Sequence, residues 1–405
     1  MKKILILTDY FPPYGGHRMG YLADFLKQNG WDVYIVCVDK IDTDASPSKC
    51  GISNNKVFRV IENNVKKYSI FSIRRIRDYI LTPEKSHEGS LKNDMIDTVL
   101  NELQGMNFSF IIASYGTKDS VIAAASQLSK ILMVPWAADL RDILEQGQYY
   151  DKSISTQLRI ILLIRRRNSL LKSTTFITTI SKWHVNYLSK KFPSRINLVY
   201  NGYDPLLFSL ESPPRKSNNF TIIYTGSLWA GIDPSIILKS LDKLFIEKEI
   251  DINNISFDVY GRVSNNNILQ KFSDYKSANC IRTFLSIGHD KIPDLLREAS
   301  LLIVIIQPKT KGIITTKAFE YIASRRPVLS FPKADGSLTE ILIQTQSGDS
   351  ADTVEEVSQM ILKLYKQWKE SGIVDNMPEN HYVCEYSREF QSAKFKDLIL
   401  NALNK

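Results

Sequence analysis

Lys317 and Glu320 stand three residues apart in the stretch TTKAFEYIA, where the pattern predicts that a helix begins after Thr315 or Thr316 as its cap. Residues at this spacing share one helix face. A cation at the amino end of a helix faces the positive end of its dipole, so Lys317 indicates that an anion binds there. We predict a diphosphate on Lys317 and the helix amides, and a ribose diol on Glu320. A surface ion pair worth less than about 1 kcal/mol is the simpler alternative.

The same helix is predicted to be amphipathic. Its buried stripe is expected at Phe319, Ile322 and Ala323. Its opposite face is expected to hold Lys317, Glu320, Tyr321 and Ser324. The cation and the carboxylate would then lie on the same side of the helix.

Three glycine turns follow predicted strands, where bare backbone can approach a phosphate or a sugar. They are formed by Gly15 and Gly16, by Gly226 with Ser227 in YTGSLWAG, and by Gly261 with Arg262 in VYGR. The spacing does not match GxGxxG, and only Asp39 offers an acidic residue after the second strand, so a nicotinamide cofactor is disfavoured. Together the turns suggest a phosphorylated ligand, although any one glycine could simply permit a tight turn.

Strands and helices must alternate to position these turns. The run KILILT, a Pro/Gly loop, the helical GYLADFLKQNG and the β-rich WDVYIVCV predict a βαβ unit with parallel strands. The alternation of strands and helices continues, with further strands predicted at FSFIIAS, ILMVPWAAD and TTFITTIS. After the turn-rich NGYDPLLFSLESPPRKSNNF it returns at FTIIYTGS, ISFDVYG, LLIVII and RPVLSF. We therefore predict an α/β protein with two parallel-sheet domains, whose ligands bind at the carboxyl ends of the strands.

The end of the chain shows helical periodicity. Its apolar positions Phe395, Leu398, Ile399 and Ala402 recur at i, i+3, i+4 and i+7. This spacing predicts a final helix with one buried face.

The composition is that of a folded protein. Of its 405 residues, 43% are apolar and 23% are charged. The length predicts two or three domains. The net charge of +9 favours anionic partners such as nucleotides, nucleic acid or an acidic membrane surface.

Four widely spaced cysteines form no CxxC pair, so neither a zinc site nor a disulfide framework is indicated and a reducing cytoplasm is expected. No segment reaches the roughly 18 to 20 apolar residues of a membrane span, and the run ILIL is too short for a signal peptide.

Two stretches mix basic with large apolar residues, VKKYSIFSIRRIRDYIL (65 to 81) and STQLRIILLIRRRNSLLK (155 to 172). Each could lie on an anionic bilayer as a peripheral contact, or could be a core-facing helix with a solvated basic face. If the second stretch meets a membrane, replacing Arg165, Arg166 and Arg167 with Ser should weaken binding to anionic vesicles.

Taken together, several motifs resemble family 4 of the GT-B glycosyltransferases, a large retaining family that includes many bacterial surface-polysaccharide enzymes. The matching pieces cover nearly the whole chain in family order: FPPYGG, ADLRD, ITTISKWHVNYL, LVYNGYD, IIYTGSL and TTKAFEYIASRRPVL. The resemblance implies two Rossmann-like domains that face an interdomain cleft. An acceptor-binding domain is expected at 1–205 and a nucleotide-sugar-binding domain at 219–385. A helix at 386–405 is expected to cross back to the first domain.

The resemblance also carries roles to single residues. Glu320 matches the family's ribose-binding carboxylate and Lys317 the basic position before it, and these two are the expected catalytic residues. The expected donor site comprises Gly15, Gly16, Gly226, Ser227, Gly261, Arg262, Thr316, Lys317 and Glu320. The expected acceptor contacts are Asp139, Arg141 and Asp142 of ADLRD, to which we add His17 of the glycine loop.

Some positions depart from the family pattern. The earlier of the family's two glutamates, eight positions apart, falls at Gly312, and Ser227 and Ala230 occupy the region where Arg and Lys often clamp the diphosphate. Neutralising the leaving diphosphate would then rest on Lys317, Arg262 and the helix amides. No histidine is predicted to act as a general base, since His184 is expected on a helix surface and His289 in a loop near the nucleotide base.

The resemblance implies a hexosyltransferase that uses a UDP- or GDP-linked donor and neither a metal nor another cofactor. Transfer would retain the anomeric configuration, with the leaving phosphate taking the acceptor proton. The expected acceptor is a glycan, carried on a lipid at the inner face of the cytoplasmic membrane, in lipopolysaccharide or capsule assembly; no nucleic-acid partner is expected. Two alternatives stay open, a nucleotide-sugar epimerase of similar architecture and a non-catalytic basic protein that binds membranes or nucleotides.

Overall fold

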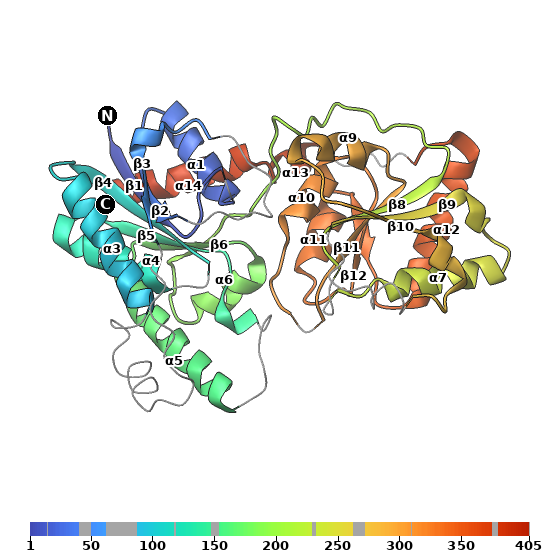
Figure 1. The fold of residues 1–405 in the computed structure, drawn as a ribbon, viewed down its shortest axis with the longest axis horizontal. Helices are drawn as coiled ribbons and strands as arrows, with labels where there is room; N and C mark the ends of the chain where they lie inside the picture. The colour runs from blue at the N-terminus through green and yellow to red at the C-terminus, as the bar shows by residue number, and fades with distance from the viewer. Residues whose placement is uncertain are drawn as a thin grey trace. The chain divides into compact units, whose positions relative to one another are not determined.

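The structure, a computed structural model, describes residues 1–13, 15–39, 50–61, 87–116, 119–146, 154–228, 232–261, 272–308, 310–374 and 380–404. The chain divides into two compact units (Figure 1). Unit 1 comprises Met1–Tyr200 and Gln391–Lys405, and unit 2 comprises Asn201–Phe390. The predicted donor residue Arg262 and the basic stretch 65 to 81 lie outside the described residues.

Unit 1 is built on a seven-stranded parallel sheet with the order β3-β2-β1-β4-β5-β6-β7. Its strands are β1 (Lys3–Thr8), β2 (Asp32–Val38), β3 (Val57–Val60), β4 (Phe108–Tyr115), β5 (Trp136–Leu140), β6 (Phe176–Thr179) and β7 (Ile196–Leu198). Its helices are α1 (His17–Gln28), α3 (His87–Glu102), α4 (Asp119–Leu132), α5 (Ile154–Leu170), α6 (Lys182–Ser189) and most of α14 (Arg388–Leu403). Short 3-10 turns occur at Asn54–Lys56, Leu144–Gln146 and Leu171–Ser173.

Both faces of the unit 1 sheet are covered, because successive residues of a strand point to opposite faces. Leu5 and Leu7 of β1 pack in one cluster with residues of α3 and α4, whereas Ile4 and Ile6 pack in a second cluster with residues of α1 and α14. The residues of α14 in that second cluster include Phe395 and Ile399, with Leu398 and Ala402 packed against it. The predicted apolar face of the last helix is therefore confirmed.

Unit 2 holds a six-stranded parallel sheet with the order β10-β9-β8-β11-β12-β13. Its strands are β8 (Phe220–Thr225), β9 (Ile255–Tyr260), β10 (Ile281–Phe284), β11 (Leu301–Ile305), β12 (Val328–Phe331) and β13 (Gly348–Ser350). Its helices are α7 (Ser235–Ile246), α9 (Ile292–Arg297), α10 (Thr316–Ala323), α11 (Ser337–Gln344), α12 (Val354–Ser371) and α13 (Asn380–Cys384). Short 3-10 turns occur at Ile252–Asn254, Lys276–Cys280 and His289–Lys291.

In both sheets the first strand of the unit lies inside the sheet, and the strand order reverses there. β1 pairs with β2 on one side and β4 on the other, and β8 pairs in the same way with β9 and β11. Such a reversal opens a crevice at the carboxyl ends of the strands, where ligands of these sheets bind. The predicted fold class, two Rossmann-like parallel sheets in one α/β chain, is confirmed.

Candidate functional site

The predicted glycine turns of unit 2 meet at the carboxyl ends of β8 and β9. The amide of Gly226 donates to the carbonyl of Tyr260 at 2.8 Å, and the amide of Gly261 donates to the carbonyl of Phe284 at 3.0 Å. A Cβ on Gly261 would collide with the carbonyl group of Gly226 and lie 2.9 Å from the amide of Ser227. Both neighbours are backbone and cannot move aside, so this close approach requires glycine.

Lys317 reaches this pair of turns from the first turn of α10. Its ammonium group lies so close to Gly226 that a Cβ there would overlap it, and it stands 5.2 Å from the centroid of the Tyr224 ring. Burial lowers the pKa of Lys317, and the nearby Glu320 carboxylate offsets only part of that shift. Within the described part of the chain, no carboxylate forms a salt bridge with Lys317. The protein therefore holds a cation in a desolvated position without neutralising it.

The amino end of α10 is also left without a side-chain cap. Thr315 occupies the N-cap position, but its hydroxyl accepts no hydrogen bond from the helix and has no partner among the described residues. The helix thus has Thr315 as its N-cap residue, as predicted, but the threonine hydroxyl does not bond to the helix. Without that cap, the amides of the first turn at Thr316 and Lys317 remain a place for an anion at the positive end of the helix.

Beyond its first two residues α10 is buried on all sides, which corrects the predicted division into a buried and a polar face. Glu320, Tyr321 and Ser324 are buried together with the apolar positions. The hydroxyl of Tyr321 lies 2.8 Å from the amide of Thr225, which donates to it, and 2.9 Å from the Thr225 hydroxyl. Because Thr225 ends β8, these bonds tie α10 to the strand that precedes Gly226. They fix the distance between Lys317 and the glycine turn.

Glu320 has a partner that sequence reasoning missed. Its Oε1 lies 2.9 Å from Nε2 of His289, which begins the 3-10 turn after β10. Sequence analysis placed His289 near a nucleotide base, and the structure places it against the predicted ribose-binding carboxylate. No sequence signal joins two residues that are 31 positions apart.

The loop between β11 and α10 contains Gly312, the position where the family pattern has a glutamate. Gly312 is left-handed, with φ of 67°, and its amide donates to Oδ2 of Asp335 at 2.6 Å. The same carboxylate oxygen accepts from the hydroxyl of Ser337. Asp335 therefore holds this loop by its backbone.

In unit 1 the loop after β1 contains Gly15, Gly16 and His17. Gly16 is the N-cap of α1 in a left-handed conformation, and a Cβ on it would collide with the carbonyl of Tyr10. Gly15 also has a positive φ, of 81°. His17 is the first residue of α1 and is half-buried. These three predicted residues thus lie together at the carboxyl end of β1, within unit 1.

Asp139, which was predicted to contact an acceptor, is fully buried in the structure. Its two oxygens accept from Nε and Nη2 of Arg18 at 3.0 and 2.8 Å, and Oδ1 also accepts from the Thr178 hydroxyl at 2.7 Å. Burial by itself would raise the pKa of Asp139, but the charge of Arg18 and the bonds from Arg18 and Thr178 hold it below the ordinary value. Asp139 is not accessible to a ligand here, and it acts as the anchor of Arg18.

The other two acceptor candidates remain at the surface of unit 1. Arg141 and Asp142 follow β5 and are half-buried. Nη2 of Arg141 and Oδ2 of Asp9 flank Gly116, each slightly more than 3 Å from the position of a Cβ on that glycine. Asp9 directly follows β1, so its position in the sequence LTDYF could have identified it as a candidate site residue. Asp142 accepts from Nε2 of Gln146 at 3.3 Å.

His184 was expected on a helix surface, and this prediction is wrong. The side chain is fully buried, and Nδ1 lies 2.9 Å from the hydroxyl of Thr179 at the end of β6. It joins α6 to the sheet and is not positioned to meet a ligand.

No family model matches the sequence, and no curated protein matches it. Solved structures match over essentially the whole chain. A glycosyltransferase from Rickettsia africae ESF-5 has a TM-score of 0.67 at 14% identity, with 100% of this chain and 99% of that chain covered. Anabaena HepE in complex with UDP has a TM-score of 0.68 at 12% identity, with coverage of 99% and 100%. Sucrose-phosphate synthase from Thermosynechococcus elongatus has a TM-score of 0.65 at 13% identity, with 99% of each chain covered.

A UDP-GlcNAc 2-epimerase from Methanocaldococcus jannaschii also matches, with a TM-score of 0.55 at 10% identity over 99% of this chain and 100% of that chain. Identities this low establish the fold and nothing finer. The chain has the GT-B fold that the glycosyltransferases among these structures share.

Proposed function

We propose that this chain is a glycosyltransferase that moves a hexose from a nucleotide-sugar donor to a glycan acceptor. The observation that carries the proposal is the position of Lys317, a desolvated cation with no salt bridge in the described residues, over Gly226 at the uncapped start of α10. A diphosphate supplies the negative charge that this arrangement lacks. Glu320, one turn further along α10, is at the spacing to accept hydrogen bonds from a ribose diol.

In this proposal the donor diphosphate lies beside Lys317, against the amides of the first turn of α10 and the backbone of the turns at Gly226, Ser227 and Gly261. UDP is the first nucleotide to test, because the Anabaena protein HepE of the same fold has been solved with UDP and with UDP-glucose. GDP is the second. As the bond between the anomeric carbon and the diphosphate breaks, negative charge grows on the leaving oxygen, and Lys317 and the helix amides stabilise it.

We propose that transfer retains the anomeric configuration. The acceptor hydroxyl would form its bond to the anomeric carbon on the face that the diphosphate leaves, and the leaving phosphate oxygen would take the hydroxyl proton. This assignment needs no side-chain base and follows the resemblance of TTKAFEYIASRRPVL to the retaining family. An inverted product would contradict it.

The acceptor side is proposed for unit 1. Arg141 and Asp142 after β5, with His17 at the start of α1, supply half-buried polar groups at the carboxyl ends of its strands. Hydrogen-bonding groups of this kind suit the hydroxyls of a glycan. A lipid-linked glycan of surface-polysaccharide assembly is the proposed acceptor, as the resemblance implies.

A nucleotide-sugar epimerase is the second candidate, because an epimerase shares the fold. Both activities need a nucleotide diphosphate site, so binding alone does not separate them. An epimerase interconverts the free donor when no acceptor is present, whereas a transferase leaves the donor sugar unchanged.

The test begins with calorimetry of the full chain against UDP, GDP, ADP and their common hexose conjugates. The nucleotide-sugar that binds, radiolabelled in its sugar, is then incubated with the protein. One reaction contains a polyprenyl-diphosphate-linked hexose as acceptor, and the other contains no acceptor. Label in the lipid-linked product, lost in Glu320→Ala, supports the transferase. Interconversion of the donor without acceptor supports the epimerase, and no binding of any nucleotide contradicts both.

A further inference from the structure

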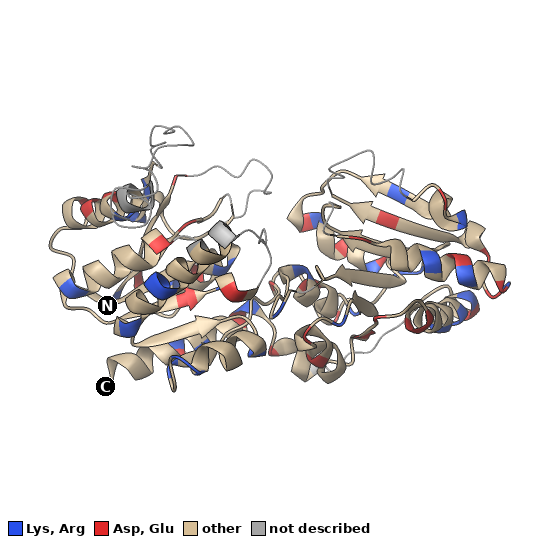
Figure 2. Cartoon of the chain, turned by 90° about the horizontal axis from the view of Figure 1, so that it is seen from below, with Lys and Arg blue, Asp and Glu red and all other residues tan. Residues whose placement is uncertain are grey.

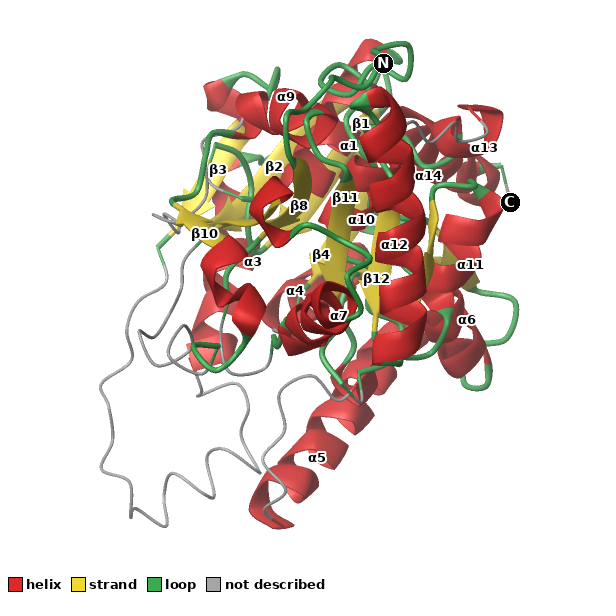
Figure 3. Cartoon of the chain, turned by 90° about the vertical axis from the view of Figure 1, so that its right-hand side faces the viewer, coloured by secondary structure: helices red, strands yellow, loops and turns green. Residues whose placement is uncertain are grey.

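Helix α5 presents an exposed apolar face. Leu158, Ile161 and Leu162 are 58%, 45% and 43% exposed, which is unusual for three large aliphatic side chains within five residues. Their spacing of i, i+3 and i+4 places them on one side of the helix, and the exposed Arg165 continues that side at i+7. We call these four residues the docking face. Figures 1 and 3 show one end of α5 extending away from the sheet of unit 1.

The opposite side of α5 faces the protein. Arg167 is fully buried, and its Nη1 and Nη2 each donate to a carboxylate oxygen of Glu145 at 2.7 Å. Arg166 is partly buried, with its Nε 3.9 Å from Oδ2 of Asp119. The sequence-based assignment of Arg165, Arg166 and Arg167 to one membrane-facing group is therefore corrected. Only Arg165 of the three is exposed, and removing Arg167 would leave a buried carboxylate unpaired.

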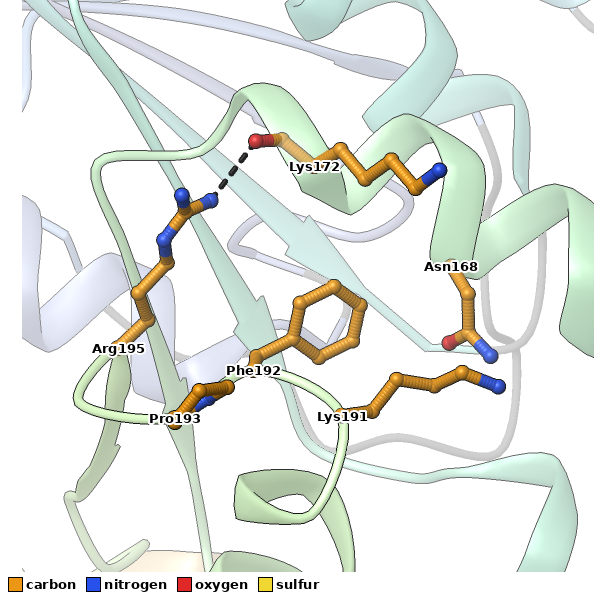
Figure 4. Close-up of a pocket in the computed structure, with 6 residues that line it drawn as sticks. All are labelled: Asn168, Lys172, Lys191, Phe192, Pro193 and Arg195. Atoms are coloured by element: carbon orange, nitrogen blue, oxygen red, sulfur yellow. Dashed lines mark hydrogen bonds between the residues drawn. The ribbon is translucent and has the colours of Figure 1, made fainter.

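A basic pocket lies where α5 ends. It has a volume of about 300 Å³ and is lined by Asn168, Lys172, Lys191, Phe192, Pro193 and Arg195 (Figure 4). The three cationic residues are exposed, and Arg195 is held by donating to the carbonyl of Lys172 at 2.7 Å. Phe192 is buried and forms an apolar wall. The lining thus combines three cations with an apolar surface and contains no carboxylate.

The docking face and the basic pocket are continuous along α5. Ile161, Arg165 and Asn168 follow one another at i, i+4 and i+7 on one side of α5, and Lys172 lies in the 3-10 turn that directly follows the helix. The surrounding sequence has a single sign of charge, because no Asp or Glu occurs between Asp151 and Asp204 while ten Lys and Arg do. Figure 2 shows a different pattern on the helices of unit 2, where basic and acidic residues are interspersed.

We propose that the docking face and the basic pocket bind the surface of an anionic phospholipid bilayer. The apolar side chains would enter the interface between headgroups and acyl chains, while Arg165 and the pocket cations bind headgroup phosphates. Charge complementarity selects this occupant. A second copy of the chain would bring like charges together, and a nucleic acid would leave the three aliphatic side chains in water.

The described part of the chain contains no helix long and apolar enough to cross a membrane. A surface contact of this kind is the mode of attachment that an exposed amphipathic helix provides. The inference deepens the proposed function, because it would bring a lipid-linked acceptor to the protein. It is argued from unit 1 alone and does not use the donor residues of unit 2.

The test is co-flotation of the full chain with vesicles of equimolar phosphatidylglycerol and phosphatidylcholine, and with vesicles of phosphatidylcholine alone. The apolar variant combines Leu158→Ser, Ile161→Ser and Leu162→Ser. The charge variant combines Arg165→Gln, Lys172→Gln and Lys191→Gln. It spares Arg167, which pairs with Glu145, and Arg195, which bonds to backbone.

Matched controls come from unit 2. Ile246, Leu285 and Ile343 are aliphatic residues, each more exposed than those of the docking face, for replacement by Ser. Lys216, Lys239 and Lys363 are exposed lysines for replacement by Gln. Circular dichroism and UDP calorimetry on every variant establish that the fold and the donor site are intact. Vesicle binding and nucleotide binding are read separately, so failure of this inference is distinguishable from failure of the proposed function.

The wild type and both controls should bind the anionic vesicles, bind phosphatidylcholine much more weakly and detach as salt is raised. Each cation removed should weaken binding about fivefold, so the charge variant should lose roughly a hundredfold. The apolar variant should lose at least about tenfold. The proposal is overturned if the wild type ignores the anionic vesicles, or if the two variants bind as tightly as their controls.

Discussion

Two charged groups at the carboxyl ends of parallel strands behave in opposite ways in the two units. In unit 1, Asp139 is fully buried and its charge is matched by two bonds from Arg18 and one from Thr178. In unit 2, Lys317 is desolvated, stands at the positive end of α10 and has no salt bridge in the described residues. A charge that the fold neutralises is explained by stability. A charge that the fold compensates only in part is what the proposed diphosphate would explain.

The largest effect is expected from breaking the compensated pair. Asp139→Asn should destabilise the protein by about 3 to 5 kcal/mol, because it leaves the Arg18 side chain, which is only 11% exposed, without its counter-charge. Urea unfolding measures this change, and Asp142→Asn, at a half-exposed position, serves as the control. A loss below about 1 kcal/mol would show that Arg18 finds other partners and that Asp139 is not the anchor described here.

The same pair predicts a dependence on pH. The pKa of Asp139 is lowered in the folded protein, so its stabilisation is present above the unfolded value of about 3.9. It is lost as the pH falls through the lowered folded value. Unfolding free energies measured below about pH 4 should therefore fall more steeply with acid in the wild type than in Asp139→Asn.

Removing the charge of Lys317 should have the opposite effect, a loss of ligand binding without a loss of stability. Lys317→Met is expected to weaken UDP binding roughly 10- to 150-fold, the value of a charge-assisted bond of about 1.5 to 3 kcal/mol, without destabilising the free protein. A lysine with a lowered folded pKa costs stability below that pKa, and the cost disappears as the pH rises above the unfolded value. At neutral pH the variant should therefore melt at the same or a higher temperature. Normal UDP binding together with a lower melting temperature would reverse our assignment.

Gly226→Ala sharpens the comparison by moving the cation and keeping its charge. The new Cβ would displace the Lys317 ammonium and would lie 2.8 Å from the Tyr224 hydroxyl. We expect roughly a tenfold loss of UDP affinity, and a much smaller loss when Lys317 is already Met. Calorimetry on the four proteins of this double-mutant cycle measures the coupling. Equal losses in both backgrounds would mean that Gly226 acts independently of Lys317.

The smallest effect is expected at His289. If its contact with Oε1 of Glu320 orients the carboxylate, His289→Ala should weaken UDP binding about fivefold, whereas His289→Gln, which can donate from a similar position, should restore most of it. Calorimetry with UDP and with UMP compares the effect on ligands that both carry ribose. An unchanged affinity in His289→Ala would leave the contact without a role in binding.

The fold was predictable because its information is local. Each buried strand is an apolar run between turn signals, and Gly261 stands where only glycine fits. The environments of single polar residues were not predictable, because they depend on distant partners. Asp139 and Arg18 are 121 positions apart, and Arg167 lies in a run of three arginines of which it alone is fully buried. The three arginines are chemically identical, and only the packing of α5 makes one of them buried and another exposed.

The same limit applies to α10. The sequence correctly placed the start of a helix next to Lys317, but it predicted a polar face where the structure has a buried Tyr321 bonded to Thr225. Apolar periodicity identifies the side of a helix that must be buried. It does not reveal that a polar side chain on the other side also finds a buried partner.

The most direct test of the central claim is calorimetry of the full chain with UDP and with uridine, in the wild type and in Lys317→Met. If Lys317 is uncompensated because it awaits a diphosphate, the wild type will bind UDP far more tightly than uridine, and the variant will lose most of that difference. If UDP, GDP and ADP bind no better than their nucleosides, or if the variant keeps the full preference, the assignment of a diphosphate site to Lys317 is contradicted.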